Sequence, residues 1–409
     1  PAAPAPATPA TAIEGAPTFA ALYPGAQTDA APVAASGPDG PGGIVFDKPL
    51  TLEGPADRSA VIAGTRQGRT VWIKAADVSL RSLTVTRSGL SLSDMDAGVF
   101  LDRTAHRARV EGNDILDNLV GVHVWGPRDA LVRGNRIVGN RELRVAERGN
   151  GVTLWNTPGT RVLDNDISAG RDGIFVNTSR LNTFSGNRFH DLRYAVHYMY
   201  TNESEISGNV ATGTDVAYAI MFSHQLIVRD NVAVDSREQG LMLNYANQSR
   251  ITGNSVDRAG KCVFIYNANY NEFQDNRFAN CDIGVHFTAG SEGNQVSGNA
   301  FINNRNQVKY VSTRTLDWSV AGRGNYWSDN TAFDLDGDGI ADTAYRPNDV
   351  VDQLLWRAPA ARILLNSPSI AIVRWAQSQF PAILPGGVID SAPLMQPPPL
   401  PARLPKESP

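Results

Sequence analysis

The sequence lacks the features that define membrane-spanning and nucleic-acid-binding proteins. No apolar run approaches the ~20 residues that a bilayer-spanning helix needs. The formal net charge is only −4 over 409 residues, so there is no electrostatic case for binding nucleic acid or an anionic membrane. With 42% apolar residues, the chain is expected to form one large folded unit with a sizeable core.

The two ends of the chain differ in composition from its middle. There is no initiator Met and no signal peptide, as in a mature secreted form. Residues 1–42 form a Pro/Ala-rich lead, which we expect to be a disordered segment and an N-terminal cap. Past residue 350 the pattern predicts a short helix over Val350–Arg357 and a second helix opened by Ser367-Pro368. Residues 350–409 are thus expected to hold terminal helices and a Pro-rich tail.

An asparagine recurs at a nearly fixed pitch along the middle of the chain. The steps between successive copies are 22, 30, 22, 22, 22, 23, 22, 23 and 26 residues. Most copies read Gly-Asn or Asp-Asn before a short alternating apolar run. Asn suits a turn because it tolerates left-handed backbone and its amide can bond to the same amide one repeat away. The copies are Asn113, Asn135, Asn165, Asn187, Asn209, Asn231, Asn254, Asn276, Asn299 and Asn325.

A repeat of this length fits a leucine-rich repeat or a parallel β-helix. The leucine framework is missing, and no copy contains a helical apolar stripe. Short runs such as Gly121–Trp125 and Gly173–Asn177 are rich in Val, Ile and Phe, which predicts strands. We therefore predict an all-β fold, a single right-handed parallel β-helix of about 22 residues per coil over residues 43–327. The charged insert 141–148 should leave its coil as a loop, either a docking feature or an inert insertion.

Aligning the copies on their Asn places the side chains of successive coils in columns. Two apolar columns, represented by Val196 and Tyr198, should point into the coil, so the two alternate columns should face out. The outward columns hold three of the six His and three of the five Met in the chain. An outward Met loses the free energy of apolar burial, so three of them on one face need a reason.

These outward columns predict a copper site. His197 and Met199 share a face, and Met221 and Met242 come from the next two coils, at ~4.8 Å per coil. Imidazole and thioethers without a carboxylate suit Cu(I) better than Zn, Mg or Ca. His224 follows Met221 in a turn and can swing in, whereas His286 lies about two coils beyond Met242 and needs movement to reach the ion.

The alternative is that this face is covered by a loop or by a partner protein. Met and aromatic side chains on a sheet face also describe a protein-binding surface. The candidate docking residues are Trp125 and Trp155 in the outward columns, with Trp375 and Phe380 in the predicted C-terminal helix.

A second metal prediction comes from the Asp-rich loop at 328–349. Residues 334–342 read Asp-Leu-Asp-Gly-Asp-Gly-Ile-Ala-Asp, which resembles the opening of a calcium-binding loop. Tyr345 stands where an EF-hand has its Glu, so this is not an EF-hand. A bound Ca²⁺ would brace the C-terminal end of the solenoid, whereas the alternative is a solvated acidic turn. The predicted ligands are Asp334, Asp336, Asp338, Asp342 and the carbonyl of Ile340.

The only two cysteines lie close to one period apart. Cys262 and Cys281 fall in neighbouring coils, displaced by about three positions relative to the Asn markers. They either form a disulfide across adjacent coils, given an oxidising compartment, or remain two buried apolar thiols.

The repeats, together with Gly324–Asp329 (Gly-Asn-Tyr-Trp-Ser-Asp), the Asp-rich loop and the coil Ala195–Met199, resemble the NosD family of periplasmic maturation factors of nitrous oxide reductase. The resemblance covers nearly the whole chain from about residue 43. It implies a periplasmic, non-enzymatic protein that works with an ABC transporter made of an ATPase and a membrane permease. It also implies assembly of the copper–sulfide cluster of the reductase, with copper delivered by a lipoprotein chaperone. The terminal helices would then contact the transporter.

Two other functions stay open. A carbohydrate-active β-helix enzyme, such as a uronate epimerase or lyase, needs a base, an acid and a neutralising group on one face, commonly His, Tyr, Arg and Asp. The outward columns contain neither Asp nor Arg, which argues against that enzyme. A docking scaffold that binds no metal is the third interpretation.

Overall fold

The structure is a computed structural model, and it describes residues 43–288, 290–311, 314–347, 351, 359–364, 367–379 and 387–399. Contacts between Cα atoms separate residues 1–40 from residues 41–409, and the description below concerns the second unit. The predicted N-terminal cap, most of the predicted helix at 350–357 and Phe380 lie outside the described residues.

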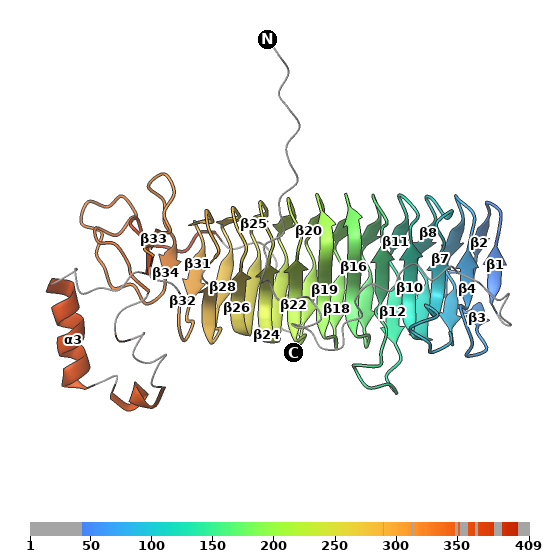
Figure 1. Cartoon of the computed structure of the whole chain (residues 1–409), viewed down its shortest axis with the longest axis horizontal. Coiled ribbons are helices and arrows are strands. Elements are labelled where there is room, and N and C mark those ends of the chain that lie inside the picture. Colours follow the sequence, from blue (N-terminus) through green and yellow to red (C-terminus); the bar gives the residue numbers. More distant parts are fainter. Residues whose placement is uncertain are drawn as a thin grey trace, which may run out of the picture. The chain divides into compact units, whose positions relative to one another are not determined.

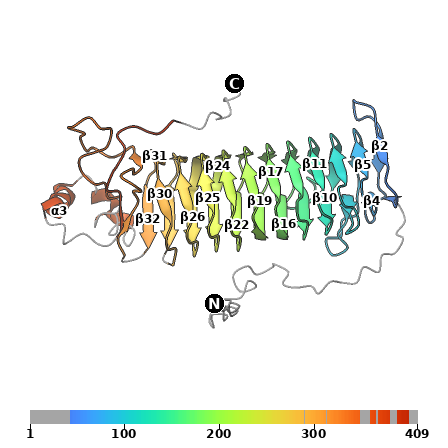
Figure 2. The same cartoon turned by 90° about the horizontal axis from the view of Figure 1, so that it is seen from above.

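The described chain is an all-β parallel solenoid, as predicted, in which coils of about 23 residues stack for about 12 turns. Figures 1 and 2 show the strands of successive coils lying side by side along the stack. Each coil contributes to three ladders of parallel strands. The first ladder holds β1 (Ile44–Phe46), β4 (Val71–Ile73), β7 (Ala97–Leu101), β10 (Val120–Trp125), β13 (Val152–Trp155), β16 (Asp172–Arg180), β19 (Tyr194–Asn202), β22 (Val216–Met221), β24 (Val232–Asn244), β26 (Ser255–Tyr266), β29 (Ile283–Thr288) and β32 (Val308–Val311).

The other two ladders complete the coil. The second is a separate sheet made of β2 (Thr51–Glu53), β5 (Ser79–Arg81), β8 (Arg109–Glu111), β11 (Leu131–Arg133), β14 (Arg161–Leu163), β17 (Thr183–Ser185), β20 (Glu205–Ser207), β23 (Ile227–Arg229), β25 (Arg250–Thr252), β27 (Glu272–Gln274) and β30 (Gln295–Ser297). The third shares the long strands β24 and β26 with the first ladder, and adds β3 (Val61–Ala63), β6 (Thr84–Thr86), β9 (Asp114–Asn118), β12 (Arg136–Gly139), β15 (Asp166–Ser168), β18 (Arg188–His190), β21 (Val210–Thr212), β28 (Arg277–Ala279), β31 (Ala300–Ile302) and β34 (Tyr326–Trp327).

The core fills the inside of the coils. The two apolar columns predicted to point inward pair in register from coil to coil and are almost completely buried. Val196 and Tyr198 of β19, for example, expose nothing to solvent. Alternation along each strand therefore sends the neighbouring side chains, such as His197, to the outer side of the same ladder.

The recurring asparagines form a buried hydrogen-bonded ladder. The backbone N–H and the side-chain amide of Asn209 both donate to the side-chain oxygen of Asn231, at 3.1 and 2.9 Å. The pattern repeats from Asn113 to Asn325 without interruption. The expectation that these asparagines adopt left-handed backbone was wrong. The Gly or Asp residue before the Asn has the positive φ instead, as in Gly208 (φ 61°) and Asp230 (φ 56°).

The ladder ends on a carboxylate from the far end of the described chain. Asp390 accepts hydrogen bonds from the backbone N–H of Asn325 at 2.7 Å and from the indole N–H of Trp327 at 2.7 Å. Burial raises the pKa of Asp390, although these donors act in the opposite direction. Asp390 directly follows β35 (Val388–Ile389), which pairs with β33 (Leu316–Asp317), so this segment closes the last coil.

Two sequence features within the coils are accommodated without disturbing the stack. Cys262 and Cys281 form a disulfide inside the solenoid, and both are buried. The insert 141–148 leaves the coil as turns closed by its own contacts, including Arg148 Nε to the carbonyl of Leu143 at 2.9 Å. The strands on either side of the insert keep their pairing, with Ile137 opposite Ile167.

Helix is confined to the C-terminal region of the described chain. It includes Val351, η1 (Pro359–Leu364) and α3 (Pro368–Gln379), and α3 begins where Ser367-Pro368 predicted a helix. The hydroxyl of Ser367 accepts a hydrogen bond from the backbone N–H of Ile370 at 3.4 Å, as expected of an N-cap. Among the described residues, neither helix combines the length and apolarity needed to cross a bilayer.

Replacing Asn209 by Ala should destabilise the solenoid by about 2–5 kcal/mol, because the carbonyl of Phe184 and both donors of Asn187 would lose a buried partner. The free energy of unfolding in urea, followed by circular dichroism, measures this loss. Asn306→Ala is the matched control, because that side chain makes one exposed 3.3 Å hydrogen bond. Equal destabilisation by the two substitutions would contradict a structural role for the ladder.

Candidate metal centre

The side chains predicted to form a copper site lie on the outer side of the first ladder, in the predicted columns. His197 of β19 pairs with Ala219 of β22, which pairs with Met242 of β24. In the adjoining column Met199 pairs directly with Met221. The small Ala219 thus separates His197 from Met242, while the two thioether side chains of Met199 and Met221 are immediate neighbours.

The expectation that this face is exposed was wrong for these residues. His197, Met199, Met221 and Met242 are only 9%, 6%, 2% and 7% exposed. The rings of Phe175 and Tyr194 lie 5.0 and 5.1 Å from that of His197. The four side chains therefore form a dry patch, in which thioethers keep most of the burial that an outward position was expected to forfeit.

The two outward columns predicted from the sequence did not include a carboxylate that lies beside His197. Nδ1 of His197 lies 3.0 Å from Oδ2 of Asp172, which is buried at the start of β16 in the preceding coil. Arg193 donates two hydrogen bonds to the same carboxylate, at 2.8 and 2.7 Å. Because a carboxylate only accepts, Nδ1 of His197 is the donor in this contact. Nε2 is buried and has no hydrogen-bond partner.

Asp172 remains ionised despite its burial. Burial would raise the pKa of its carboxyl group, but the hydrogen bonds from His197 and Arg193 lower it to about 2. A carboxylate hydrogen-bonded to the far nitrogen of an imidazole fixes the ring and increases the basicity of the other nitrogen, an arrangement common behind metal-ligating His. The signal was present in the sequence, because Asp172 occupies the column one position before Gly173.

This donor set fits a soft monovalent metal. An unpartnered imidazole nitrogen and neighbouring thioethers are the ligands that Cu(I) prefers, and the carboxylate of Asp172 is engaged by His197 and Arg193 instead of facing the ion. His197 and the three buried Met side chains are the residues that would hold such an ion.

The structure does not bring the other two predicted copper ligands into this patch. His224 is exposed in the next turn, where its backbone N–H bonds to Asn202 and its Nδ1 faces the amide of Asn247 at 3.3 Å. His286 lies two coils from Met242, with Phe264 between them. Burial, and then Lys309 and Lys261, lower the pKa of His286 to about 4. Its Nδ1 is also buried without a partner.

Aromatic side chains lie on the same ladder as the patch. Trp125 and Trp155, two of the predicted docking residues, stack at 5.5 Å, and Trp155 is 39% exposed. Tyr200, Phe222 and Tyr245 stack at 5.1 Å intervals directly after the Met columns, each with positive φ. Bulky residues adopt that conformation at a cost of about 1–2 kcal/mol each, so this aromatic row is not favoured by the local backbone.

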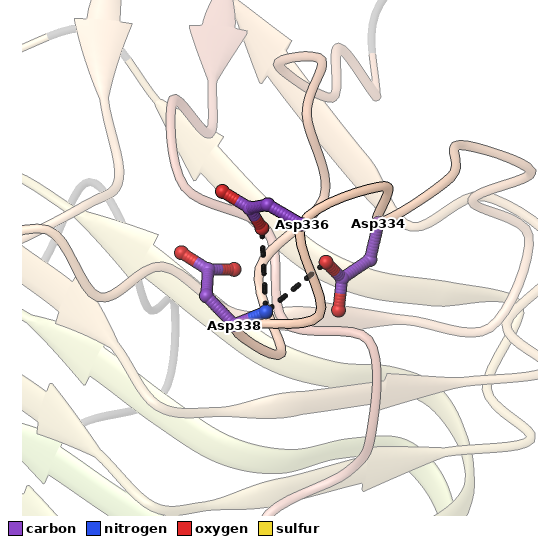
Figure 3. Close-up of side chains that lie close together, drawn as sticks. All are labelled: Asp334, Asp336 and Asp338. Atoms are coloured by element: carbon purple, nitrogen blue, oxygen red, sulfur yellow. Dashed lines mark hydrogen bonds between the residues drawn. The ribbon is translucent and has the colours of Figure 1, made fainter.

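The Asp-rich loop gathers three of its predicted metal ligands (Figure 3). Asp334, Asp336 and Asp338 each offer an oxygen within 4.8 Å of the others. The carboxylate of Asp334 accepts hydrogen bonds from the backbone N–H groups of residues 337, 338 and 339, and the bond from residue 339 contributes most to lowering its pKa. Asp342 accepts from the N–H of Leu335 at 2.8 Å. Ile340 pairs with Leu394, which ties the loop to the C-terminal segment.

The fold defines the class: a parallel β-solenoid protein. Among solved structures it is similar to the Dettilon tailspike protein, with a TM-score of 0.54 at 15% identity over 66% of this chain and 60% of that one. That likeness shows the fold alone.

Residues 133–332 match the model of a family described as NosD, periplasmic copper-binding protein. The chain is 42% identical to a probable ABC transporter binding protein NosD of Stutzerimonas stutzeri, over 87% of this chain and 84% of that protein. It is 38% identical to the protein of the same name from Pseudomonas aeruginosa, over 87% and 86%. This chain belongs to the NosD family.

The calcium site stays a prediction, and thermal unfolding tests it. Ca²⁺ should raise the unfolding temperature, because an ion held by the three carboxylates binds only the folded loop and stabilises the closing segment around Leu394. Asp334→Asn together with Asp336→Asn should remove that shift. The exposed Asp282→Asn serves as the control. An unfolding temperature that does not respond to Ca²⁺ or to a chelator would contradict the prediction.

Proposed function

We propose that this protein is a periplasmic, non-enzymatic accessory factor that binds Cu(I) and passes it on during assembly of the copper–sulfide cluster of nitrous oxide reductase. The observation that carries the proposal is the buried, unpartnered Nε2 of His197, oriented by Asp172 beside a pair of thioethers. Support comes from the family description, which names a periplasmic copper-binding protein.

The ligands of this patch suit temporary binding and transfer of Cu(I) better than its permanent storage. Cu(I) needs no fixed coordination geometry from a rigid cage, and thioethers are neutral ligands that leave the positive charge of the ion uncompensated. A thiolate would hold the ion more tightly, but both cysteines are consumed in the disulfide. His197 and the Met pair would accept copper from a chaperone lipoprotein and release it to the reductase.

The partners in this proposal are an ABC transporter of permease and ATPase, nitrous oxide reductase and the copper chaperone. The relatives named as ABC transporter binding proteins support the first of these. Helix α3 offers an apolar surface for that contact, since Ile372 and Trp375 are 63% and 64% exposed. Apolar side chains exposed together commonly mark a site of protein association.

A uronate-modifying enzyme is the second candidate, because the structure removes one argument against it. His197, Asp172, Arg193 and Tyr194 do converge, whereas the outward columns alone contained neither Asp nor Arg. The burial of Asp172 and His197 favours a small ion over a polysaccharide, which needs an open cleft. Turnover of alginate or pectin fragments by the purified protein would favour the enzyme. A scaffold that binds no metal is the outcome if neither activity nor copper binding is found.

Replacing Met199, Met221 and Met242 by Leu should abolish Cu(I) binding at this patch while leaving the fold intact, because Leu conserves volume and removes only the sulfur. Anaerobic titration with a chromogenic Cu(I) chelator as competitor measures the affinity. Met395→Leu, at the C-terminal end of the described chain, is the matched control. Unchanged affinity in the triple variant would refute this site.

Asp172→Asn provides a second test of the same centre. Loss of the carboxylate behind His197 should weaken Cu(I) binding roughly 10- to 100-fold without removing any ligand. A purely structural role for Asp172 would lower the unfolding temperature and leave the Cu(I) affinity of the folded protein unchanged.

Docking through α3 predicts that Ile372→Ser with Trp375→Ser prevents co-purification with the membrane transporter, because the exposed apolar surface is lost. Tyr270→Ser is the control, because Tyr270 is 64% exposed on a turn of the solenoid. Retention of the transporter by the double variant would place the contact elsewhere.

A further inference from the structure

Three large aromatic side chains stand at a turn position that neighbouring coils give to small polar residues. Tyr200, Phe222 and Tyr245 each follow positions that pair in register from coil to coil, so they form one column of stacked rings. All members of this column have positive φ, and the other three are Asn156, Thr178 and Asn267. Asn adopts this left-handed conformation readily, whereas a bulky residue there is an outlier that points to a function.

The turns that carry this aromatic row also form a hollow with an acidic rim. Arg229 pairs with both Glu205 and Asp230, at 2.7 and 2.9 Å, so one guanidinium serves two carboxylates. Glu203 adds a third, exposed carboxylate. Even with Arg180 included, three carboxylates face two cations, and the rim keeps a negative charge. The hollow has a volume of about 570 Å³, and its lining includes Leu181, Ile227, Glu203, Glu205 and Gln225.

The aromatic row and the hollow lie within reach of one partner segment. Tyr200 and Glu203 are three residues apart in one turn, so their Cα atoms are at most ~11 Å apart. The stretch between row and hollow is polar, with Asn202, His224 and Asn247 at equivalent positions of three coils. Aromatic anchors beside polar, adaptable side chains are typical of surfaces that bind other proteins.

One face of the Tyr200 ring is left open by its neighbours in the column. Phe222 stacks on Tyr200 with 17° between the ring planes, and so covers one face. On the other side the column continues to Thr178, whose side chain is small. Tyr200 is accordingly 48% exposed. The hollow extends over the same two coils, because Leu181 follows Thr178 and Glu203 follows Tyr200, each by three residues.

This combination of groups favours a cationic side chain of a polypeptide. A guanidinium stacks on an aromatic face, donates to carboxylates and packs its aliphatic stem on apolar side chains. Tyr200, Glu203 and Leu181 supply one contact of each kind. The negative rim repels an anionic lipid surface and an acidic polysaccharide alike. Arginine is also one of the residues that contribute most to protein interfaces.

We propose that the aromatic row and the hollow beside it form a docking site for a partner protein, which inserts an arginine of an exposed segment there. The guanidinium lies over the open face of Tyr200 and donates to the rim carboxylates, while its stem packs on Leu181. This site goes beyond the proposed function, in which α3 makes the contact with the transporter. It does not depend on the binding of copper.

Fluorescence anisotropy tests the proposal with the full chain and a labelled peptide of alternating Gly and Arg as the probe. The same peptide with Glu in place of Arg should bind roughly tenfold more weakly, because the rim repels it. The triple variant Tyr200→Asn, Phe222→Asn and Tyr245→Asn should weaken binding of the Arg peptide roughly tenfold. Asn occupies this position in two other coils, so the triple variant should keep the fold, which circular dichroism checks.

Glu203→Gln should weaken binding of the Arg peptide severalfold, because an exposed ion pair is lost. Gln is tolerated there, since Gln225 and Gln248 hold the equivalent position with positive φ. Tyr270→Asn, outside the aromatic row, and Glu142→Gln, in the charged insert, are the matched controls. Cu(I) affinity should be the same in Glu203→Gln as in the wild type, so the docking site and the copper patch are tested separately.

Two sets of results would overturn the proposal. The docking site is refuted if the Arg peptide shows no saturable binding, or if it binds the folded triple variant as tightly as Tyr270→Asn. The assignment of a cationic partner is refuted if the two peptides bind equally, or if Glu203→Gln binds the Arg peptide as tightly as Glu142→Gln.

Discussion

The amide ladder is the interaction on which the rest of this structure depends. The side-chain oxygen of an Asn such as Asn209 accepts two buried hydrogen bonds from the Asn of the previous coil, and its own backbone N–H and side-chain amide donate two to the Asn of the next coil. A slip of one residue in any coil would break several buried hydrogen bonds at once and would turn the apolar columns toward solvent. The ladder therefore fixes register over the whole stack, and the columns of side chains on the outer face follow from it.

The outer side of the first ladder, which carries the proposed copper patch, is less favourable in its local packing and backbone conformation than the interior. The side chains of the interior columns are apolar and buried, and their strands pair in register, as Val196 and Tyr198 show. On the outer side, His197 and His123 retain buried nitrogens without partners, and aromatic residues follow the Met columns with positive φ. Departures of this kind are expected where a binding site, and not stability, has selected the residues.

Much of this arrangement could be predicted from the sequence, because a repeat of fixed length shows which residues of successive coils lie next to each other. The parallel solenoid, the inward columns and the neighbours of Met199 all follow from counting. The burial of His197 could not be predicted, since it depends on how the large side chains of Phe175 and Tyr194 lie against its ring. The contact of Asp172 with His197 was missed because it runs diagonally between columns, and the Asp390 cap because it returns from 65 residues beyond Asn325.

The carboxylate cap has a consequence for how the chain folds. The bonds between asparagines have a direction, because each Asn donates to the Asn of the next coil and the series ends at Asp390, whose carboxylate only accepts. In a polypeptide threaded into a new compartment with its N-terminus leading, each coil can dock on the one before it as it emerges. The donors of Asn209 find their acceptor 22 residues later, in Asn231, whereas the backbone N–H of Asn325 finds its acceptor only 65 residues later, in Asp390. Closure of the last coil thereby depends on a residue far along the chain from the repeats, and not on the next coil.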